Sequence, residues 1–314
     1  MGGGATIGID LGGTNTKGGV LDAAGRLTTR LSIATEAERG FEHVFERIVR
    51  LVRDLSGQSC GDAVGVGLAA PGPLSHATGV IHAAPNLPGW VNIRLAELLS
   101  AAVGLPVGLE NDANAAAYGE HIAGAGVGCQ NMVMLTLGTG VGGGVILGGQ
   151  LVRGAFESAG EVGHMIVALD GRPCPCGQRG CLERYASAAA IAARARQRID
   201  AGDETVLPAG RDLDAQDVAE AAGRGDALAR EIWEDACRRL AQACVNLTHL
   251  INVERIVLGG GLSAAGEALL EPTRRHFEAL FWRLTDERPQ ILTARLGDDA
   301  GVIGAAALAR MPAA

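Results

Sequence analysis

The stretch that decides the fold is "TIGIDLGGTNTKGGV", residues 6–20. Apolar and β-branched residues lie on both sides of Gly12-Gly13, and this pattern predicts two strands joined by a glycine turn. Residues 131–154, "NMVMLTLGTGVGGGVILGGQLVRG", repeat the arrangement. Two such openings, each followed by α/β sequence, predict a duplicated domain rather than one long sheet.

The rest of the chain alternates between helical and strand-like periodicity. Helices are expected in the first half over residues 38–55, 94–102 and 113–122, with strands over 63–70 and 107–110. The second half is expected to contain helices over 227–250 and 264–281, strands over 255–258 and 290–294, and a closing helix after Asp299. Residues 196–217 are polar and are predicted to form a surface loop between helices.

No linker rich in serine and proline separates the two halves, so the repeat places the domain boundary. We expect an N-terminal α/β domain over residues 1–117 and a C-terminal α/β domain over residues 118–299. The last helix, about residues 300–314, is expected to return to the first domain.

Length and charge restrict the possible functions. A chain of 314 residues favours about two domains, each able to bury its own core. Its net charge of -8, with acidic and basic residues mixed along the chain, predicts no nucleic-acid partner. The start "MGGGATIGID" lacks a signal-peptide pattern, and no segment has the ~20 apolar residues of a membrane span. We therefore expect a cytoplasmic protein that has no membrane partner.

The first glycine turn has two interpretations. Asp10 ends a predicted strand, and Gly12 and Gly13 would let backbone N–H groups approach an anion such as a nucleotide phosphate. A tight hairpin that needs glycine for positive φ is the alternative. Strand-like residues follow the turn, which excludes a Rossmann fingerprint. The second turn, "LGTGVGGG" from Leu137, and a third glycine loop at residues 259–261 favour the nucleotide.

A cysteine cluster lies in "GHMIVALDGRPCPCGQRGC", residues 163–181. A cytoplasmic location argues against a structural disulfide, whereas three thiolates and one imidazole form a standard zinc set. The ligands would be His164, Cys174, Cys176 and Cys181. Because the Cys-x-Cys spacing is tighter than usual, unligated buried thiols are the alternative. Four protein ligands would leave no open position for water, so the zinc would be structural.

Together these motifs resemble the ROK family of sugar kinases and regulators. The resemblance implies an α/β protein with the two-domain, actin-like ATPase (ribonuclease H-like) fold and a cleft between the domains. It also implies that Asp10 holds Mg²⁺, directly or through water, and that Thr139 helps to cradle the phosphates. The full set of expected ATP and Mg²⁺ contacts is Asp10, Gly12, Gly13, Thr14, Lys17, Gly138, Thr139, Gly140, Gly259, Gly260 and Gly261.

The sequence Glu110-Asn111-Asp112 ends a predicted strand and opens an alanine-rich helix. By residue type alone, Asn111 or Asp112 would serve as a helix N-cap. The resemblance implies that Asn111 binds the sugar and that Asp112 is the base that takes the proton of the attacking hydroxyl. Such a carboxylate suits phosphoryl transfer, which depends on positioning and charge neutralisation.

A hexose presents a ring of hydroxyls, so carboxylates and amides from several loops would have to converge on it. The further sugar-contact candidates are Gly72, Asn86, Glu161, His164 and Glu183. Each could also be an ordinary loop residue, and turn chemistry explains Asn86 between prolines equally well.

The resemblance also favours zinc, because "EVGH" and "CPCGQRGCLE" match the family signature at every defining position. A zinc-ordered loop would position Glu161 and Glu183. We therefore expect zinc loss to weaken sugar binding more than ATP binding.

The implied activity is ATP-dependent phosphorylation of a hexose, with glucose as the first candidate. N-acetylglucosamine, N-acetylmannosamine, mannose and fructose are alternative substrates, and polyphosphate is an alternative donor. A sugar-responsive regulator of the same family would carry a helix-turn-helix domain first, and only six residues precede Ile7. The family resemblance further implies a homodimer or homotetramer.

Overall fold

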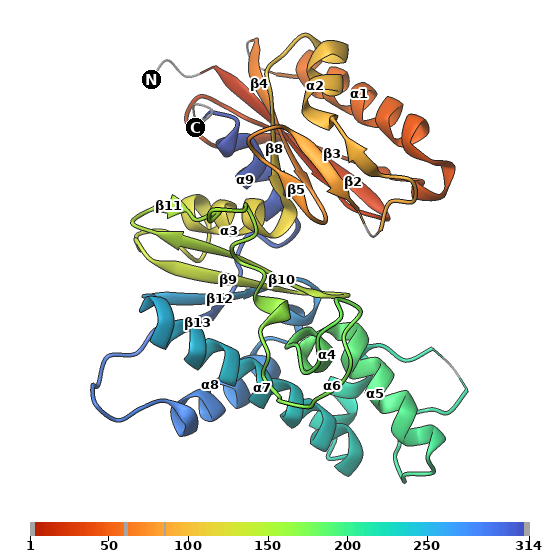
Figure 1. The fold of residues 1–314 in the computed structure, drawn as a ribbon, viewed down its shortest axis with the longest axis vertical. Helices are drawn as coiled ribbons and strands as arrows, with labels where there is room; N and C mark the ends of the chain where they lie inside the picture. The colour runs from red at the N-terminus through yellow and green to blue at the C-terminus, as the bar shows by residue number, and fades with distance from the viewer. Residues whose placement is uncertain (1–3, 60–61, 85, 211, 311–314) are drawn as a thin grey trace. The chain divides into compact units, whose positions relative to one another are not determined.

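The structure, a computed structural model, describes residues 4–59, 62–84, 86–210 and 212–310 (Figure 1). The chain forms two compact units. Unit 1 comprises Met1–Gly128, Leu151–Ala159 and Leu296–Ala314, and unit 2 comprises Cys129–Gln150 and Gly160–Arg295. The expected boundary after residue 117 falls inside helix α3 (Asp112–Ala123), which lies whole in unit 1 because it packs on the C-terminal helix α9 (Ala300–Leu308).

Unit 1 is built on a five-stranded sheet of order β3-β2-β1-β4-β8. The first three strands are antiparallel, and β4 and β8 run parallel to β1. The bounds are β1 (Ala5–Leu11), β2 (Asn15–Leu21), β3 (Leu27–Ala34), β4 (Ala63–Ala70) and β8 (Val107–Asn111). A small second sheet contains β5 (Leu74–Ser75), β6 (Val80–Ala83) and β7 (Val91–Ile93).

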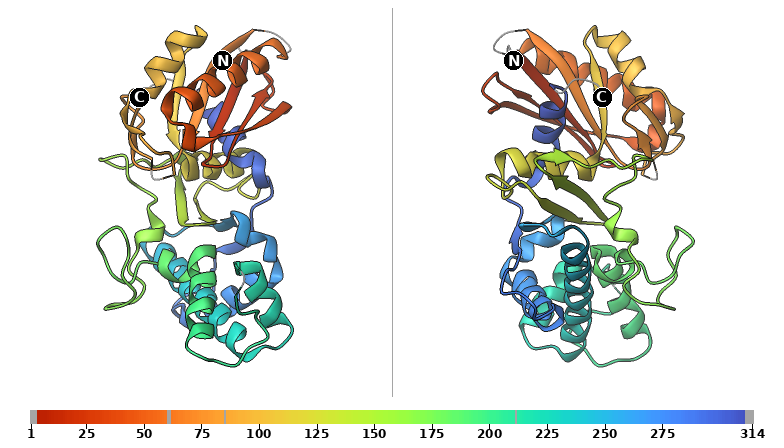
Figure 2. Two further views of the ribbon diagram at one scale, coloured as in Figure 1. Left: turned by 90° about the vertical axis from the view of Figure 1, so that its right-hand side faces the viewer. Right: turned by 60° about the vertical axis from the view of Figure 1, so that its left-hand side comes forward.

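Helices cover both faces of this sheet (Figure 2). On one side lie α1 (Phe41–Gly57) and α2 (Leu95–Val103), preceded by the 3-10 turn η1 (Ala37–Arg39). On the other side lies α9, preceded by η4 (Gly297–Asp299). Gly67 on β4 directly faces the carbonyl of Ala305, and Gly304 faces the carbonyl of Ala115, so neither position has room for a Cβ. These glycines allow α9 to lie close to the sheet and to α3.

Unit 2 repeats the sheet in the order β11-β10-β9-β12-β13. Again an antiparallel hairpin is followed by two parallel strands. The bounds are β9 (Met132–Leu137), β10 (Val141–Leu147), β11 (Gln150–Leu151), β12 (Arg255–Gly259) and β13 (Gln290–Thr293). The duplication predicted from the two glycine hairpins is therefore confirmed for the sheets.

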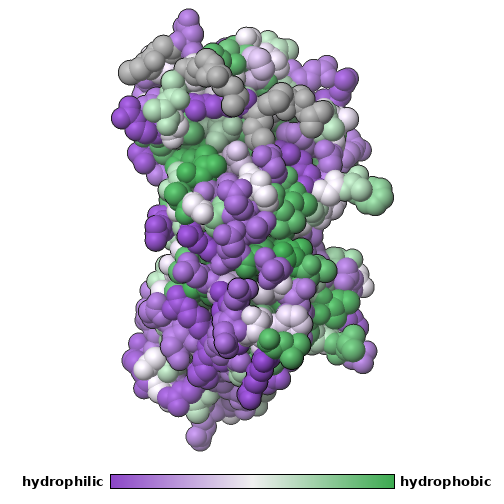
Figure 3. Space-filling view, turned by 90° about the vertical axis from the view of Figure 1, so that its left-hand side faces the viewer, coloured by the Kyte–Doolittle hydropathy of each residue, from purple (hydrophilic) through white to green (hydrophobic). Residues whose placement is uncertain are grey.

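The helices of unit 2 include one long amphipathic helix, α7, which packs against α6 and α8. The bounds are α4 (Glu183–Ala186), α5 (Ala188–Asp200), α6 (Ala215–Gly223), α7 (Ala227–Ile251) and α8 (Glu267–Leu280), with 3-10 turns η2 (Val162–His164) and η3 (Gly261–Ala265). None of the described helices is long and apolar enough to cross a membrane. Over unit 2, in the lower part of the view, the face drawn in Figure 3 is mostly hydrophilic with small hydrophobic groups.

The polar segment 196–217 was predicted to be a loop, and this is only partly correct. Helix α5 continues to Asp200, because Ile191 and Ala195 bury one face at helical spacing while the arginines face outward. Helix α6 then begins at Ala215, where Asp214 and Asp217 form a capping box. The loop is therefore confined to the residues between these helices.

Candidate active site and metal cluster

The first glycine turn, between β1 and β2, is held by Thr35 at the end of β3. The N–H of Thr35 donates to the carbonyl of Thr14 at 2.7 Å, and its hydroxyl donates to the carbonyl of Gly12 at 2.7 Å. Within the turn, the Gly12 N–H donates to the Asn15 carbonyl at 3.1 Å. These contacts shape the turn that carries Gly12, Gly13 and Thr14.

Asp10 lies next to this turn and close to a second carboxylate. Burial and the charge of Asp112 raise the pKa of Asp10 to about 6, whereas the charge of Lys17 acts in the opposite direction. A methyl group added at Gly301 would lie 2.6 Å from Oδ2 of Asp10, so this carboxylate packs on the first turn of α9. Lys17 Nζ lies 2.9 Å from Oδ1 of Asp298. A divalent cation with oxygen ligands would relieve the repulsion between Asp10 and Asp112, so the pair fits Mg²⁺.

A test of this environment is Asp10→Asn. The pKa of Asp10 in the folded protein, about 6, lies above its usual 3.8. Its ionisation therefore costs stability as pH rises from 4 through 6. We expect the variant to be more stable than the wild type at pH 7.5, by up to ~3 kcal/mol, and to show much less gain at pH 4. Thermal melts of the metal-free proteins at both pH values would measure this. A less stable variant at pH 7.5 would contradict the assignment.

Asn111 and Asp112 lie at the start of α3. Their geometry is compatible both with helix capping and with ligand binding. Oδ1 of Asn111 accepts hydrogen bonds from the N–H groups of Ala113 and Asn114 at 3.0 and 3.2 Å, so Asn111 is the N-cap. Its Nδ2 has no hydrogen-bond partner among the described residues and stays available as a donor. Oδ1 of Asp112 accepts from the Ala113 N–H at 2.8 Å. Capping therefore leaves Asn111 a donor for a ligand.

Two further sugar candidates lie in the same unit. A methyl group added at Gly13 would be 3.1 Å from Cβ of Asn86, so the loop of Asn86 meets the first glycine turn. Gly72 has a φ of 87° and follows β4, whose Ala70 pairs with Asn111. Because β1, β4 and β8 are parallel, their carboxyl ends share one edge of the sheet, which is where α/β proteins bind ligands. Unit 1 therefore gathers Asp10, Gly13, Gly72, Asn86, Asn111 and Asp112.

In unit 2 the second glycine turn meets the third glycine loop. Gly260 has a φ of 78°, and a Cβ there would lie 2.5 Å from the carbonyl oxygen of Leu137. The carbonyl of Gly138 accepts from the Ala188 N–H at 2.8 Å. Thr139 is exposed at the tip of the turn. The turn over residues 138–140 and the loop over residues 259–261 therefore form one surface.

A pocket of about 510 Å³ adjoins this loop within unit 2. Its apolar walls contain Leu262 and Trp233, and the indole N–H of Trp233 donates to the carbonyl of Ala268 at 2.8 Å. Gln216 and Glu220 on α6 also line the pocket. Apolar walls with a few polar groups suit a planar base and its ribose hydroxyls.

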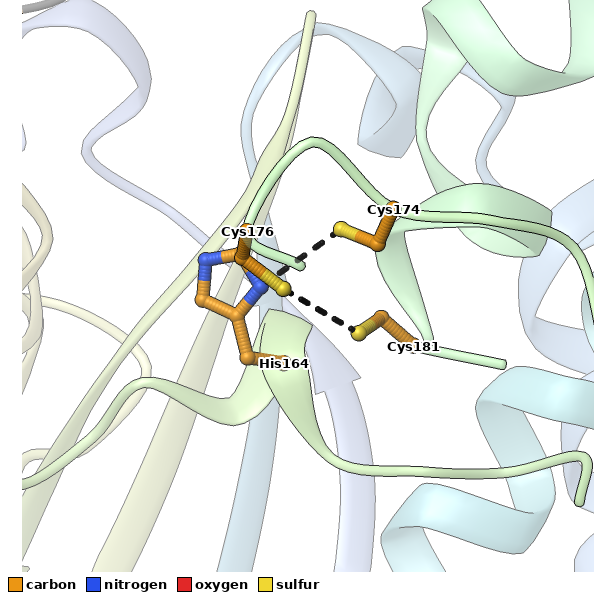
Figure 4. A group of neighbouring side chains, drawn as sticks. All are labelled: His164, Cys174, Cys176 and Cys181. Carbon is orange, nitrogen blue, oxygen red and sulfur yellow. Dashed lines mark hydrogen bonds between the residues drawn. The ribbon is translucent and has the colours of Figure 1, made fainter. Parts of the chain in front are cut away.

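The predicted metal ligands come together (Figure 4). Their ligand atoms all lie within 4.8 Å of one another, with 3.9 Å from Cys174 Sγ to His164 Nδ1 and 3.7 Å from Cys176 Sγ to Cys181 Sγ. The edge of a tetrahedron with Zn–S bonds of about 2.3 Å is about 3.8 Å, so these separations suit four-coordinate zinc. The four donors therefore lie close to the positions that four-coordinate zinc requires.

The structure shows a contact between Glu183 and the second glycine turn. Its Oε2 accepts from the N–H of Val141 at 3.0 Å, and a methyl group at Gly140 would lie 2.5 Å from this oxygen. Glu183 follows Cys181 by two residues, so the metal loop supports the second glycine turn directly. Zinc loss is therefore expected to affect this turn as well, and the expectation that it weakens sugar binding more than ATP binding stays a prediction. Glu161 is exposed, and no hydrogen bond engages Nε2 of His164 among the described residues.

Sequence reasoning missed several residues that shape these sites. Thr35 holds the first turn through Gly12 and Thr14, and Ala188 holds the second turn from a helix that was not predicted. No local pattern marks such residues, since their roles depend on how strands and loops meet. The one signal of the site that is visible in the sequence is the pair of polar residues in β8, Glu110 and Asn111.

Two α/β units with matching sheets, each with a glycine turn after its first strand, define a phosphotransferase-type protein of the actin-like ATPase fold. The paired carboxylates of unit 1 agree with that class. The chain belongs to the ROK family: the model described as "ROK family" matches residues 6–311.

Similar proteins include sugar kinases. A protein of Halalkalibacterium halodurans named glucokinase is 41% identical over 306 residues, which cover 95% of this chain and 92% of that protein. The structure of a ROK hexokinase from Thermus thermophilus has a TM-score of 0.84 and 36% identity and covers 97% of both chains. A ROK family glucokinase from Streptomyces griseus, solved in complex with glucose and AMPPNP, has a TM-score of 0.83 and 38% identity over 98% of this chain and 99% of that chain.

Proposed function

We propose that this chain transfers the γ-phosphoryl group of ATP to a hydroxyl of a hexose, with glucose as substrate and glucose 6-phosphate as product. The observation that carries the proposal is that Asp10 and Asp112 lie at the carboxyl ends of β1 and β8 on the same sheet, beside the first glycine turn. Relatives named glucokinase, and one solved with glucose and AMPPNP, support the choice of substrates. Retention of both carboxylates disfavours a non-catalytic, sugar-responsive regulator.

In this mechanism Asn111 donates its free Nδ2 hydrogens to the sugar and Asp112 orients the attacking hydroxyl. As the new O–P bond forms, Asp112 takes the hydroxyl proton, and the bond between the γ-phosphorus and the bridging oxygen of ADP breaks. Asp10 would hold Mg²⁺, which neutralises phosphate charge. Further sugar contacts would come from Gly72, Asn86, Glu161, His164 and Glu183.

Each unit has its own glycine-rich elements that can contact a nucleotide. In unit 2 the base and ribose occupy the pocket beside Gly261, and the turn at Gly138, Thr139 and Gly140 binds phosphate oxygens through its backbone and hydroxyl. Gly260 lets the third glycine loop lie against the backbone of Leu137, and Gly259 lies against the side chain of Met134. The first turn, with Gly12, Gly13, Thr14 and Lys17, binds the terminal phosphates.

One structural Zn²⁺ would be held by His164, Cys174, Cys176 and Cys181. Bound there, it keeps Glu183 under the second glycine turn and leaves His164 Nε2 for a sugar hydroxyl. Assembly as a homodimer or homotetramer and a cytoplasmic location remain predictions from the sequence.

The experiment that tests the function is a panel of sugars and donors in a coupled assay of ADP release. Glucose, mannose, fructose, N-acetylglucosamine and N-acetylmannosamine would each be tested with ATP, and polyphosphate would be tested with glucose by product analysis. We expect glucose to give the highest kcat/KM with ATP. Release that depends on another sugar would replace the substrate, and none with any sugar would overturn the kinase.

Glucose should also stabilise the protein by mass action. At a concentration of 100 Kd the gain is about 2.7 kcal/mol, which is readily visible as a higher melting temperature. Galactose at the same concentration serves as the control for nonspecific effects. A shift with another hexose and none with glucose would contradict the substrate assignment but keep the mechanism.

A further inference from the structure

A buried carboxylate lies two residues before the proposed base. Glu110 is the penultimate residue of β8 and has 4% of its surface exposed. Its Oε1 accepts from the N–H of Asn111 at 3.1 Å and from Nδ2 of Asn114 at 3.0 Å. Its Oε2 accepts from Nε and Nη2 of Arg153, both at 2.8 Å. One oxygen therefore holds the first turn of α3, and the other holds Arg153.

Arg153 comes from a segment that leaves unit 2 in the sequence. Leu151–Ala159 belongs to unit 1, although the residues on both sides of it belong to unit 2. The segment is attached by Arg153 and by Glu157, whose Oε1 accepts from the N–H of Ala77 at 2.9 Å. Phe156 between them is 91% exposed, so burial of this ring does not hold the segment. Its described polar attachments to the rest of unit 1 are therefore these two side chains.

The Arg153–Glu110 pair differs from a surface ion pair in its energetics. Both Glu110 oxygens are fully used, and two guanidinium hydrogens converge on one of them, which is the geometry that compensates for desolvation. His76 cannot replace Arg153, because its Nδ1 donates to the carbonyl of Leu109 at 2.9 Å and lies 3.7 Å from the Glu110 carboxylate. Loss of Arg153 would leave a buried charge without its cation and would release the β8–α3 junction.

We propose that Arg153 is a positioning residue for phosphoryl transfer, acting through Glu110 on Asn111 and Asp112. The inference rests on the proposed function, since it assigns the sugar contact and the base to these two residues. The guanidinium fixes the orientation of the Glu110 carboxylate, and the carboxylate fixes the start of α3.

The test compares Arg153→Met with Glu157→Gln. Arg153→Met removes the attachment to Glu110, whereas Glu157→Gln removes only the charge of the attachment to Ala77 and leaves Glu110 untouched. We expect Arg153→Met to lower kcat 10–100-fold, the range for a small misplacement of reacting groups, with KM for ATP changed less than about twofold. Arg153→Lys should recover part of kcat, because it keeps the charge without the two-pronged geometry. Glu157→Gln should stay within about threefold of the wild type.

A second measurement separates this inference from the kinase assignment. Hydrogen exchange at the amides of residues 111–114 should accelerate in Arg153→Met and not in Glu157→Gln, whether or not the substrate is glucose. If Arg153→Met does not fold, the double variant Glu110→Gln/Arg153→Met removes both charges and takes its place. Unchanged kcat and unchanged exchange would overturn the role of Arg153, as would equal losses in both variants. A wild type without any hexose-dependent turnover would instead overturn the proposed function, and exchange alone would then decide whether Arg153 orders α3.

Discussion

Asp112→Ala is expected to lower kcat by about 10²–10⁴-fold, the usual contribution of a general base. Asp112→Asn should lose nearly as much, although its side-chain oxygen can still accept the Ala113 N–H that Asp112 accepts at 2.8 Å. The helix start is then preserved and the base alone is lost. Rapid-quench measurement of hexose phosphate formation, with ATP and hexose both saturating, would give the rate of the chemical step.

Two controls accompany this result. Melting temperature and ATP affinity should stay near the wild-type values in Asp112→Asn, because the N-cap oxygen of Asn111 remains in place. The pKa of Asp10 should fall, since the charge of Asp112 contributes to raising it. Near-wild-type turnover together with a lowered Asp10 pKa would show that Asp112 is not the base. Its role would then be limited to the start of α3 and to its charge effect on Asp10.

The second large effect is expected at the metal cluster. Purified protein should contain about one zinc per chain, and Cys176→Ser should reduce this to near zero, because a structural site needs all four ligands. Zinc loss should lower the melting temperature and weaken both hexose and ATP binding, since Glu183 links the loop to Val141. Elemental analysis and isothermal titration with each ligand would measure these changes.

Matched variants separate the metal from the link. Cys237→Ala removes a buried cysteine of unit 2 that lies outside the cluster, and it should keep its zinc. Glu183→Gln should keep zinc and raise KM for ATP several-fold, because a neutral acceptor binds the Val141 N–H less strongly. Active, never-chelated protein without zinc would contradict the metal site. If Cys176→Ser lost affinity for the hexose and not for ATP, the link from the metal loop through Glu183 to Val141 would be contradicted.

Much of the fold could be predicted because its signals are local. Strand β4 occupies the predicted residues 63–70, and α7 extends one residue beyond the predicted 227–250. The same holds for the metal cluster, whose ligands lie close together in sequence. Two parts of the fold were not predicted. Helix α5 buries mainly alanines and has a polar outer face, so its hydrophobic pattern is weak. The three strands of the small sheet are too short to show a periodic pattern.

The site was predicted as residue types and not as contacts. Asp10 and Asp112 are 102 positions apart, and only strand order brings β1 and β8 to one edge. Glu183 was predicted as a sugar contact because carboxylates suit hydroxyls, whereas the structure shows it accepting a backbone N–H. The link between Glu110 and Arg153 spans 43 residues and could not be predicted from either segment alone.

The place of α9 has a consequence for synthesis on the ribosome. Ala305 and Ala306 are fully buried against the sheet of unit 1, yet residues 300–308 are translated only after all of unit 2. Domains usually fold as they emerge, beginning with the N-terminal one. The first unit therefore cannot complete its fold, and one face of its sheet stays uncovered, until α9 leaves the exit tunnel. Unit 2 can fold first, and a message truncated before residue 300 would yield a chain whose first unit never closes.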